Sequence, residues 1–350
     1  MKKILVIRVG NMGDVLMATP FLRALHKVFP LSEVDFVTSP QAYGIVANNP
    51  YVKNIFIYKK YKDFWGGIRR EMLCRRLKAR GYDLCFVLEE HPQYKDFGSR
   101  SVSSKALKVG FSGQKEECLT YKLDFSHDKH VIENYLNMLQ EFFQAEFTED
   151  DLSMDLIVRN TTAADQLKQE VKSLGKYVLI HPGTTEYLPY RSWTPEGYAQ
   201  IIDDFQEKGI AVLLTGQAMH QPLIDQILKQ CKIQGRVANI HCLLDKDFDD
   251  LIYYIQNASV VLCSDTGVLH VARALNVPVL GLFGPSNPQH TGAIGKGVYG
   301  FIRNDFPCGP CNYSPQYRYE EKKSCLDGNP PPCMRSITAD RVKILLRKLN

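Results

Sequence analysis

The strongest constraint on the fold is an alternation between short apolar, β-branched runs and longer amphipathic stretches, which occurs twice along the chain. The first series covers residues 1 to about 155, and the second begins near residue 175. Parallel strands need long crossover connections, usually helices, so this pattern is typical of parallel sheets covered by helices. The sequence therefore predicts an α/β protein of two domains, each with a parallel sheet.

Five strands are expected in each domain. In the first domain they are Ile4–Val9, Val34–Thr38, Val52–Tyr58, Leu84–Leu88 and Leu107–Phe111. In the second domain they are Tyr177–His181, Ala211–Thr215, Val237–Ile240, Val260–Cys263 and Val277–Phe283. Apolar residues recur at helical spacing over Val15–Phe29, which predicts one helix there. In the second domain, helices are expected to begin near Pro195, Gln221, Phe248 and Thr266.

A polar segment between the two series contains the expected interdomain linker, near residues 156–163. We expect an N-terminal Rossmann-like domain at residues 1–158, a C-terminal Rossmann-like domain at residues 164–335, and a C-terminal helix at residues 336–350. A Pro- and Cys-rich excursion over residues 306–334 departs from the alternation. Ligands of open α/β folds bind outside the carboxyl ends of the strands, so we expect the two sheets to face a central cleft.

The charge of the chain is modest overall but concentrated in one stretch. Lys and Arg outnumber Asp and Glu by 43 to 38, a formal net charge of +5, and no nucleic-acid partner is expected. Between Lys53 and Arg80, however, ten Lys or Arg residues accompany only two acids, which predicts an anionic partner. Nowhere are 18 consecutive residues apolar, so neither a membrane-spanning helix nor a signal peptide is expected.

Because no leader is expected, the ten cysteines predict reduced thiols in a cytoplasm. Six of them are scattered, mostly among apolar neighbours, and are expected to be small core residues: Cys74, Cys85, Cys118, Cys231, Cys242 and Cys263. The other four begin with a C-x2-C pair that has the spacing of a zinc knuckle: Cys308, Cys311, Cys325 and Cys333. These four could form a structural zinc site; packed thiols and a pair of disulfides are the alternatives.

Three loops that follow strands carry polar groups suited to chemistry. The first, Gly10–Asp14, has G-x-x-G spacing, which differs from the dinucleotide-binding fingerprint. Asp14 stands where a helix N-cap would stand, so capping and catalysis are both open for it. The second loop, His181–Thr185, is followed by Arg191 and Trp193. Glycine allows a ligand to approach the backbone closely, two hydroxyls can donate hydrogen bonds, and an arginine supplies a fixed positive charge. Together these groups suit the binding of a diphosphate. The alternative is an ordinary turn, with Arg191 solvated or stacked on Trp193.

The third loop, Ser264–Gly267, begins a helix that contains His270. Unpaired backbone N–H groups at a helix N-terminus favour a phosphate there. Because a carboxylate pointing at the phosphate would repel it, we expect Asp265 to cap backbone N–H groups while Thr266 and Gly267 face the ligand. For His270 alone, a structural role is the simpler interpretation.

Together the three loops resemble the ADP-heptose:lipopolysaccharide heptosyltransferase family, glycosyltransferase family 9. The matching stretches are Ile4–Val15 with Thr19–Leu25, His181–Thr185 with Arg191–Trp193, and Ser264–Leu275 with Leu282–Pro288. The resemblance implies a GT-B fold, with the acceptor bound largely by the first Rossmann-like domain and the nucleotide sugar by the second. It also implies inversion at the anomeric carbon, and catalysis that requires no cofactor or divalent metal.

The resemblance further implies roles for single residues. Asp14 matches the general base that takes the proton from the acceptor hydroxyl, and Arg191 matches a basic residue that stabilises the departing diphosphate. Asp265 and His270 would lie near the nucleotide. The family's contacts to the donor phosphates fall on Thr184, Thr185, Thr266 and Gly267. The acidic residue that the family commonly has after Gly216 is absent, and Gln217, Met219 and His220 are found there.

The expected function is transfer of a heptose, or a similar sugar, from ADP-heptose to a lipopolysaccharide core or related surface saccharide. The expected partners are the donor, a lipid-linked saccharide acceptor and an anionic membrane surface, and the expected location is cytoplasmic, peripheral at the inner face of the membrane. A basic patch is expected to bind the acceptor or the membrane, unless it is only a solvated helix face: Lys59, Lys60, Lys62, Arg69 and Arg70. A nucleotide-sugar epimerase on the same fold and a non-catalytic nucleotide-sugar-binding protein are the alternative functions.

Overall fold

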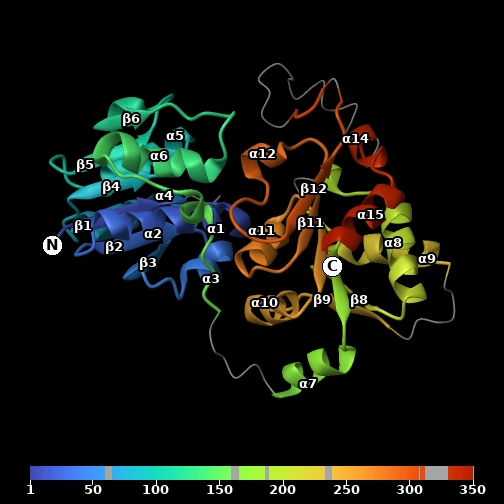
Figure 1. The fold of residues 1–350 in the computed structure, drawn as a ribbon. Coiled ribbons are helices and arrows are strands. Elements are labelled where there is room, and N and C mark those ends of the chain that lie inside the picture. The colour runs from blue at the N-terminus through green and yellow to red at the C-terminus, as the bar shows by residue number, and fades with distance from the viewer. Residues whose placement is uncertain are drawn as a thin grey trace. The chain divides into compact units, whose positions relative to one another are not determined.

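The structure is a computed structural model that describes residues 1–59, 65–158, 165–185, 189–232, 239–306, 308–311 and 330–349. The chain divides into two compact units, Met1–Ile157 and Val158–Asn350, each built on one sheet (Figure 1). Residues 159–163 of the expected linker and residues 307 and 312–329 of the expected excursion lie outside the described part.

The first unit contains a six-stranded parallel sheet in the order β3-β2-β1-β4-β5-β6. Its strands are β1 (Lys3–Ile7), β2 (Glu33–Thr38), β3 (Asn54–Ile57), β4 (Leu84–Val87), β5 (Leu107–Phe111) and β6 (Tyr121–Leu123). Five of them confirm the expected strands to within two residues at each end. The sequence does not predict β6, because this edge strand is only three residues long and its side chains are partly or fully exposed.

Helices cover both faces of the first sheet. They are α1 (Met12–Leu16), α2 (Thr19–Val28), α3 (Tyr43–Val46), α4 (Trp65–Lys78), α5 (Pro92–Arg100) and α6 (Val131–Phe143), with short 3-10 turns at Pro40–Ala42, Glu116–Cys118 and Glu149–Leu152. On one face, Phe21 of α2 meets Phe86 of β4 with ring centroids 5.0 Å apart. On the other face, Cys74 and Leu77 of α4 pack in one core cluster with Phe97 of α5.

The single helix expected over Val15–Phe29 is wrong, because the segment forms two helices. Helix α1 ends at Leu16 and α2 begins at Thr19. Pro20 lies in the first turn of α2, where its missing N–H has no intrahelical role; inside a continuous helix, its ring would clash with the carbonyl of Leu16. The Thr19 hydroxyl donates to that carbonyl at 2.7 Å. Apolar periodicity continues through the break and therefore does not reveal it.

The second unit contains another six-stranded parallel sheet, in the order β12-β11-β10-β7-β8-β9. Its strands are β7 (Tyr177–His181), β8 (Ala211–Gly216), β9 (Ile240–Leu244), β10 (Val260–Ser264), β11 (Val279–Phe283) and β12 (Tyr299–Arg303). Of the strand expected at Val237–Ile240, residues 237–238 lie outside the described part; β9 begins at its last residue, Ile240, and continues to Leu244. β12 is not predicted. Both are edge strands with largely half-buried side chains, so their apolar pattern is weaker than that of the central strands.

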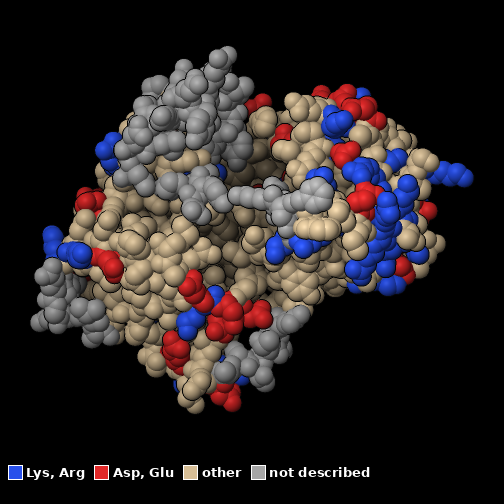
Figure 2. All heavy atoms as spheres, turned by 180° about the vertical axis from the view of Figure 1, so that it is seen from behind, with Lys and Arg blue, Asp and Glu red and all other residues tan. Residues whose placement is uncertain are grey.

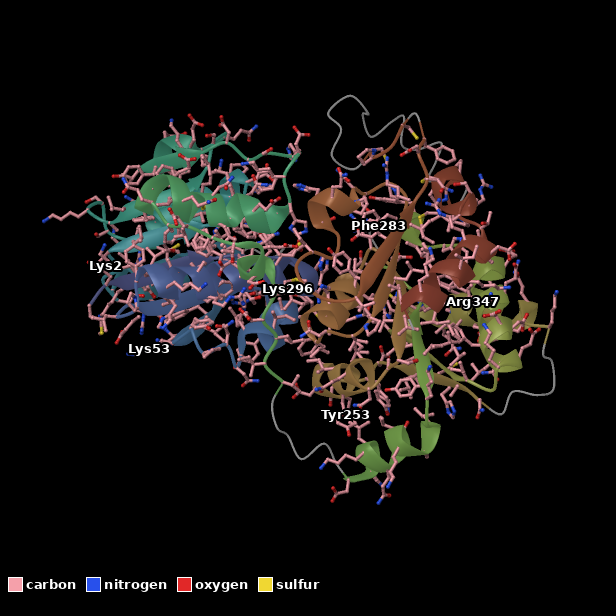
Figure 3. All side chains as sticks on the ribbon, in the orientation of Figure 1. Lys2, Lys53, Tyr253, Phe283, Lys296 and Arg347 are labelled. Carbon is pink, nitrogen blue, oxygen red and sulfur yellow. The ribbon has the colours of Figure 1, made fainter. Side chains whose placement is uncertain are left out.

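The helices of the second unit begin close to the expected residues. They are α7 (Asp165–Leu174), α8 (Pro195–Glu207), α9 (Gln221–Gln230), α10 (Phe248–Gln256), α11 (Gly267–Ala274), α12 (Pro288–Thr291), α14 (Pro332–Arg335) and α15 (Ala339–Leu349), with 3-10 turns at Pro189–Arg191 and Ala218–His220. Helices α8, α9 and α15 share one core cluster with the sheet. At the surface, Arg347 of α15 donates to Asp204 of α8 at 3.2 Å (Figure 3). Within the described residues, no helix has both the length and the apolar character needed to span a bilayer.

The cysteines follow the sheets. Four of the six expected core cysteines are buried. Cys118 is half-buried, and Cys242 is exposed. The core expectation is wrong for Cys242 because it lies on the edge strand β9, where one face meets solvent.

The strand order fixes where each sheet can hold a ligand. In the first sheet the chain runs outward from β1 through β2 to β3, and then resumes at β4 on the other side of β1. In the second sheet it runs from β7 to β9 and resumes at β10 beside β7. Ligands of open α/β sheets bind at such switch points, outside the carboxyl ends of the two central strands. The loops after β1 and β4, and those after β7 and β10, are therefore the expected ligand-binding positions of the two sheets.

Candidate active site

At the switch point of the first sheet, Arg8 links two carboxylates. Arg8 directly follows β1, and Glu89 lies two residues beyond β4. The Arg8 guanidinium contacts Glu89 Oε2 at 2.7 Å through Nη1 and Asp14 Oδ1 at 3.1 Å through Nη2. Glu89 also accepts the backbone N–H of Val9 at 2.7 Å. Sequence analysis identified Asp14 but not Arg8 or Glu89, whose only sequence signal is a charged residue directly after an apolar strand.

The three side chains differ in exposure. Glu89 is 9% exposed and Arg8 is 13% exposed, while Asp14 is 37% exposed. Burial raises the pKa of Glu89, although Arg8 and the Val9 N–H oppose the shift. Burial also disfavours the charged form of Arg8, but Tyr135, Glu89 and Asp14 outweigh it and raise the pKa of Arg8. The guanidinium is thus a permanent cation, and Asp14 is the most exposed side chain of the three.

Asp14 is held in place by the backbone of its own loop. The N-cap of α1 is Asn11, so the expectation that Asp14 occupies the cap position is wrong; Asp14 lies three residues inside, where its Oδ2 accepts the Asn11 N–H at 2.9 Å. A Cβ atom at Gly10 would lie 2.5 Å from the Cβ of Asp14 and 2.7 Å from its Oδ2. Gly10 is therefore required for the close approach of this carboxylate to the turn.

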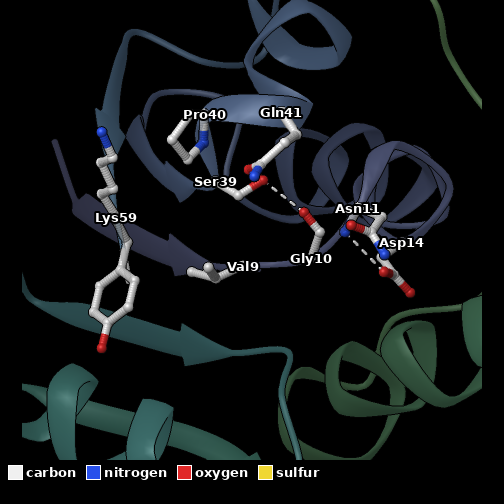
Figure 4. A pocket seen from close by; sticks show the side chains of 9 residues that line it. Val9, Gly10, Asn11, Asp14, Ser39, Pro40, Gln41 and Lys59 are labelled. Carbon is white, nitrogen blue, oxygen red and sulfur yellow. Dashed lines mark hydrogen bonds between the residues drawn. The ribbon is translucent and has the colours of Figure 1, made fainter. Parts of the chain in front are cut away.

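A pocket of about 630 Å³ opens at the same edge of the sheet (Figure 4). Its lining comes from the loops after β1, β2 and β3: Val9, Gly10, Asn11, Asp14, Ser39, Pro40, Gln41, Tyr58 and Lys59. The Ser39 hydroxyl donates to the Gly10 carbonyl at 2.6 Å and ties two of these loops together. In Figure 4, Asp14 and Lys59 lie on opposite sides of the row of lining side chains. The pocket thus offers one anionic and one cationic group to a polar ligand.

The expected basic patch is only partly part of this pocket. Lys59 lines it, whereas Arg69 and Arg70 are exposed on α4 and are not among its lining residues. Lys60 and Lys62 lie outside the described residues.

At the switch point of the second sheet, Arg191 meets Asp265. Arg191 ends the 3-10 turn that follows β7, and Asp265 directly follows β10. Arg191 Nη1 lies 2.8 Å from Asp265 Oδ2 and donates to the Asp265 carbonyl at 3.3 Å. Among the described residues, the buried Nε of Arg191 has no hydrogen-bond partner. The expectation that Asp265 caps backbone N–H groups is therefore wrong: its carboxylate is attracted to the stronger local charge, the guanidinium.

Trp193 anchors the segment that carries Arg191. Its side chain is 1% exposed, its Nε1 donates to the Ile337 carbonyl at 3.0 Å, and its ring lies against Tyr198 with centroids 5.1 Å apart. Arg191 is neither solvated nor dependent on stacking against Trp193, because it pairs with Asp265 at 15% exposure. The tryptophan thus fixes the chain, and the pairing with Asp265 orients the guanidinium.

Helix α11 begins next to this ion pair. Thr266 is its N-cap and Gly267 its first residue, as expected, but the Thr266 side chain makes no capping hydrogen bond. The first N–H groups of a helix lack intrahelical partners and attract anions. His270 lies in the same helix and is 4% exposed. Arg191, Asp265, Thr266 and Gly267 thus form one group at the carboxyl end of β10.

The two threonines of the second loop line a neighbouring pocket of about 330 Å³. Thr184 and Thr185 share it with Ser192, Trp193 and His220, while Arg191, Thr266 and Gly267 are not among its lining residues. The structure therefore divides the expected phosphate-binding residues between two adjacent loops. Ser192 and Trp193, which directly follow Arg191, connect the two groups along the chain.

His220 holds the Thr184 loop, and sequence analysis did not give it a role. Its Nδ1 accepts the Gln217 N–H at 3.0 Å, so its Nε2 carries the proton and donates to the Thr184 carbonyl at 2.8 Å. A Cβ atom at Gly183 or Gly216 would lie 2.3 or 2.7 Å from the ring. Gly183, two residues after β7, and Gly216, the last residue of β8, leave room for the imidazole ring, and they are the sequence signal for a bulky side chain between the two loops.

His181 lies against His220 with ring centroids 5.9 Å apart, and its Nδ1 is 3.2 Å from the Thr215 hydroxyl. Burial and the neighbouring His220 lower the pKa of His181 to about 4. This histidine is therefore neutral at physiological pH and contributes no charge to the loop.

The structure describes three of the four cysteines proposed for zinc. Cys308, Cys311 and Cys333 are half-buried, and Cys325 lies outside the described residues. Over the described ranges, no three His, Cys, Asp or Glu side chains are placed to hold a metal ion. The four-thiolate site stays a prediction, since its fourth member is not described.

Comparison with known proteins matches this arrangement to one family. The sequence model for glycosyltransferase family 9 (heptosyltransferase) matches residues 70–320. The chain is 24% identical over 369 residues to lipopolysaccharide heptosyltransferase 1 of Pseudomonas aeruginosa, covering 99% of this chain and 98% of that protein. Two solved structures share the fold. One is the family 9 glycosyl transferase of Veillonella parvula, with a TM-score of 0.79, 19% identity, and coverage of 99% and 97%. The other is ADP-heptose LPS heptosyltransferase II of Escherichia coli, with a TM-score of 0.76, 20% identity, and coverage of 100% and 98%.

These findings confirm the expected GT-B fold of two Rossmann-like units and decide between the alternative functions. The family model covers well over half of the chain, and the family consists of glycosyltransferases rather than epimerases or binding proteins. With two parallel sheets, each carrying charged groups at its switch point, the chain belongs to glycosyltransferase family 9, the heptosyltransferases.

Proposed function

We propose that this glycosyltransferase moves a heptose from ADP-heptose to a saccharide of the lipopolysaccharide core, with inversion at the anomeric carbon and without a metal ion. The names of similar proteins support the substrates, since one is an ADP-heptose LPS heptosyltransferase and another a lipopolysaccharide heptosyltransferase. The observation that carries the chemistry is the Arg191 guanidinium. It is paired with Asp265 beside the N-terminus of α11 and retains a buried Nε–H without a partner in the described residues.

In this proposal Asp14 is the general base. Its carboxylate takes the proton from the acceptor hydroxyl as that oxygen attacks the anomeric carbon, which contributes about a hundredfold to ten-thousandfold in rate. Arg8 holds one carboxylate oxygen and the Asn11 N–H holds the other, so the group is oriented before the acceptor arrives. Glu89 pairs with the other terminal nitrogen of the Arg8 guanidinium. The positive charge of Arg8 is therefore shared between two carboxylates and does not fully offset the negative charge of Asp14.

The second unit binds the donor and stabilises its departing diphosphate. The bond between the anomeric carbon and the phosphate oxygen breaks, and its electron pair stays with ADP. Arg191 and the first N–H groups of α11, at Thr266 and Gly267, would meet the new negative charge. Each charge-assisted hydrogen bond to the diphosphate contributes about 1.5 to 3 kcal/mol. We propose that these fixed groups replace a metal ion, that Thr184 and Thr185 add hydroxyl donors, and that His270 lies near the nucleotide.

The first unit binds the acceptor. Lys59 lines the same pocket as Asp14 and would pair with a carboxylate or phosphate of a lipid-anchored saccharide. Such an acceptor places the reaction at the inner face of the cytoplasmic membrane, with the enzyme attached peripherally. We further propose a structural zinc ion on the four thiolates Cys308, Cys311, Cys325 and Cys333. Metal analysis of anaerobically purified protein should find about one zinc per chain, and a stable, metal-free preparation would disprove it.

Turnover of defined substrates tests the function. The full chain is incubated with ADP-heptose and a core acceptor that lacks the heptose, with and without EDTA; ADP release and heptose-bearing product are measured together. We expect equal amounts of both, unchanged by EDTA, and a product with the opposite anomeric configuration by proton NMR. Sugar epimerised without acceptor would support the epimerase alternative. Tight donor binding with no turnover would support the binding-protein alternative, and either result would overturn the proposal.

A further inference from the structure

Helix α4 carries an apolar stripe on its outer surface. Trp65 is 58% exposed, Ile68 44% and Met72 64%. These residues are three and four positions apart, so they lie on one side of the helix within about one sixth of its circumference. Single exposed apolar residues are common on protein surfaces, but three in a row along one helix form a continuous patch that marks an interaction site.

Arginines flank this stripe on both sides. At about 100° per residue, Arg75 falls on one side of it, and Arg69 and Arg76 on the other. All three are exposed. The helix also carries Arg70 and Lys78, and Figure 2 shows Lys and Arg side chains gathered on this face of the first unit.

Within α4 itself, five Lys or Arg residues accompany one acid. The one acid of α4, Glu71, already pairs with Arg75 at 3.1 Å and with Arg100 of α5. The outer surface of α4 therefore keeps a strong positive charge around an apolar centre.

The opposite side of α4 fixes the helix to the sheet. Cys74 and Leu77 are buried in the core cluster with strand residues. Arg76, beside the stripe, directs its guanidinium toward the sheet, 5.3 Å from the centre of the Phe56 ring on β3, and Arg80, just after the helix, lies 5.5 Å from the same ring. The apolar stripe therefore cannot turn inward without unpacking this face, and it stays at the surface.

The position of α4 in the chain connects it with the acceptor pocket. Strand β3 ends at Ile57, and the next residues, Tyr58 and Lys59, line the pocket at the carboxyl edge of the sheet. Helix α4 then returns the chain toward the start of β4, which is parallel to β3 within the same sheet. Trp65, the first residue of α4, therefore lies on the same edge of the sheet as the pocket.

We propose that α4 is a membrane-contact helix that lies on an anionic lipid surface, with Trp65, Ile68 and Met72 between the lipid headgroups and Arg69 and Arg75 on lipid phosphates. A helix with an apolar stripe flanked by basic residues binds this interface, and anionic lipid strengthens the attraction. Tryptophan is favoured at headgroup depth. The inference deepens the proposed function, on which it rests for its purpose, because it would bring the pocket to a lipid-anchored acceptor.

Vesicle flotation of the full chain tests this contact. Vesicles of phosphatidylcholine alone are compared with vesicles that also contain phosphatidylglycerol, at low and high salt. We expect binding only with phosphatidylglycerol, weakened by salt, and reduced at least tenfold in the triple variant Trp65→Ser, Ile68→Ser, Met72→Ser. The matched control is Ile344→Ser, which removes a similarly exposed apolar side chain from the second unit (54% exposed). Unreduced binding of the triple variant would overturn the proposal, as would equal loss in the control.

Tryptophan fluorescence gives a second, direct readout. The chain has two tryptophans, and Trp193 is buried at 1% exposure. A blue shift of the emission on addition of phosphatidylglycerol vesicles therefore reports Trp65 entering the interface, and it should vanish in Trp65→Phe. A shift that persists in Trp65→Phe, or no shift when the wild type floats with vesicles, would contradict insertion of the stripe. Salt-sensitive binding to nucleic acid that survives the triple substitution would indicate a different anionic partner.

A transfer assay separates this proposal from the proposed function. With acceptor dispersed in detergent, the triple variant should match the wild-type rate, whereas with acceptor in vesicles its rate should fall at least tenfold. Equal losses in both assays would mean that the stripe does not act through the membrane. If the wild type transfers no sugar under either condition, the proposed function fails, and the flotation result still decides the membrane contact.

Discussion

Replacing Asp14 by asparagine tests the general base most directly, because it removes a charge with almost no change in volume. We expect kcat to fall at least a hundredfold, which corresponds to about 2.7 kcal/mol of activation free energy. The fold should survive. The Asp14 side chain is 37% exposed, so loss of its 3.1 Å ion pair with Arg8 costs about 0.5 kcal/mol. The asparagine carbonyl can still accept the Asn11 N–H that now bonds to Oδ2 at 2.9 Å.

The assay separates chemistry from binding. Initial rates are measured with donor and acceptor both saturating, and ADP affinity is measured by calorimetry. The affinity should not change, because Asp14 lies in the first unit and the proposed diphosphate ligands lie in the second. Asp128→Asn, an exposed carboxylate of the same unit, is the matched control and should retain the wild-type rate. A loss of less than threefold in Asp14→Asn would refute the role of Asp14 as base.

Three other predictions follow from the two switch points. Arg191→Ala should weaken ADP binding at least tenfold in calorimetry, through loss of a charge-assisted bond to the diphosphate; unchanged affinity would remove Arg191 from the phosphate site. Glu89→Gln should lower the free energy of unfolding by about 3 kcal/mol in urea denaturation, because it leaves the 13% exposed Arg8 without its stronger partner, and a loss below 1 kcal/mol would contradict this. The pKa of His181 is lowered to about 4 in the folded chain. As pH falls, this histidine is therefore protonated in the unfolded chain before it is protonated in the folded chain. Stability should therefore be full above about pH 6.5 and fall by about 3 kcal/mol by pH 4, and His181→Gln should flatten this dependence in thermal melts.

The central strands were predictable because they are buried on both faces. The strands β1, β4, β7 and β10 are almost fully apolar. A short run of this kind is typical of a central strand of a parallel sheet, where side chains on both faces are buried. The edge strands β9 and β12 carry half-buried residues; the sequence did not predict that β9 continues to Leu244, and it missed β12. Edge strands face solvent on one side, so their composition approaches that of a loop.

The site was predictable residue by residue but not as a set of contacts. Sequence analysis singled out Asp14 and Arg191, yet it assigned Asp265 to backbone capping and gave no role to Arg8 or Glu89. Arg191 and Asp265 are 74 residues apart, and Val9 and Glu89 are 80 residues apart. A local sequence pattern does not predict which distant charged residue will come within 3 Å of a given side chain, because the order of strands in the sheet determines that contact.

Local chemistry in the sequence determined the elements of this protein: apolar runs became strands, glycine and polar residues ended them, and a proline divided one helix into two. The tertiary structure alone decided which loops became neighbours, because β4 and β10 each return to the side of the first strand of their sheet. That placement brings Glu89 to Arg8 and Asp265 to Arg191. The physical reason is that a strand or helix forms through the burial and hydrogen bonds of a few neighbouring residues. A charged pair, in contrast, can join residues far apart in sequence, and the order of strands in the sheet determines which of them meet.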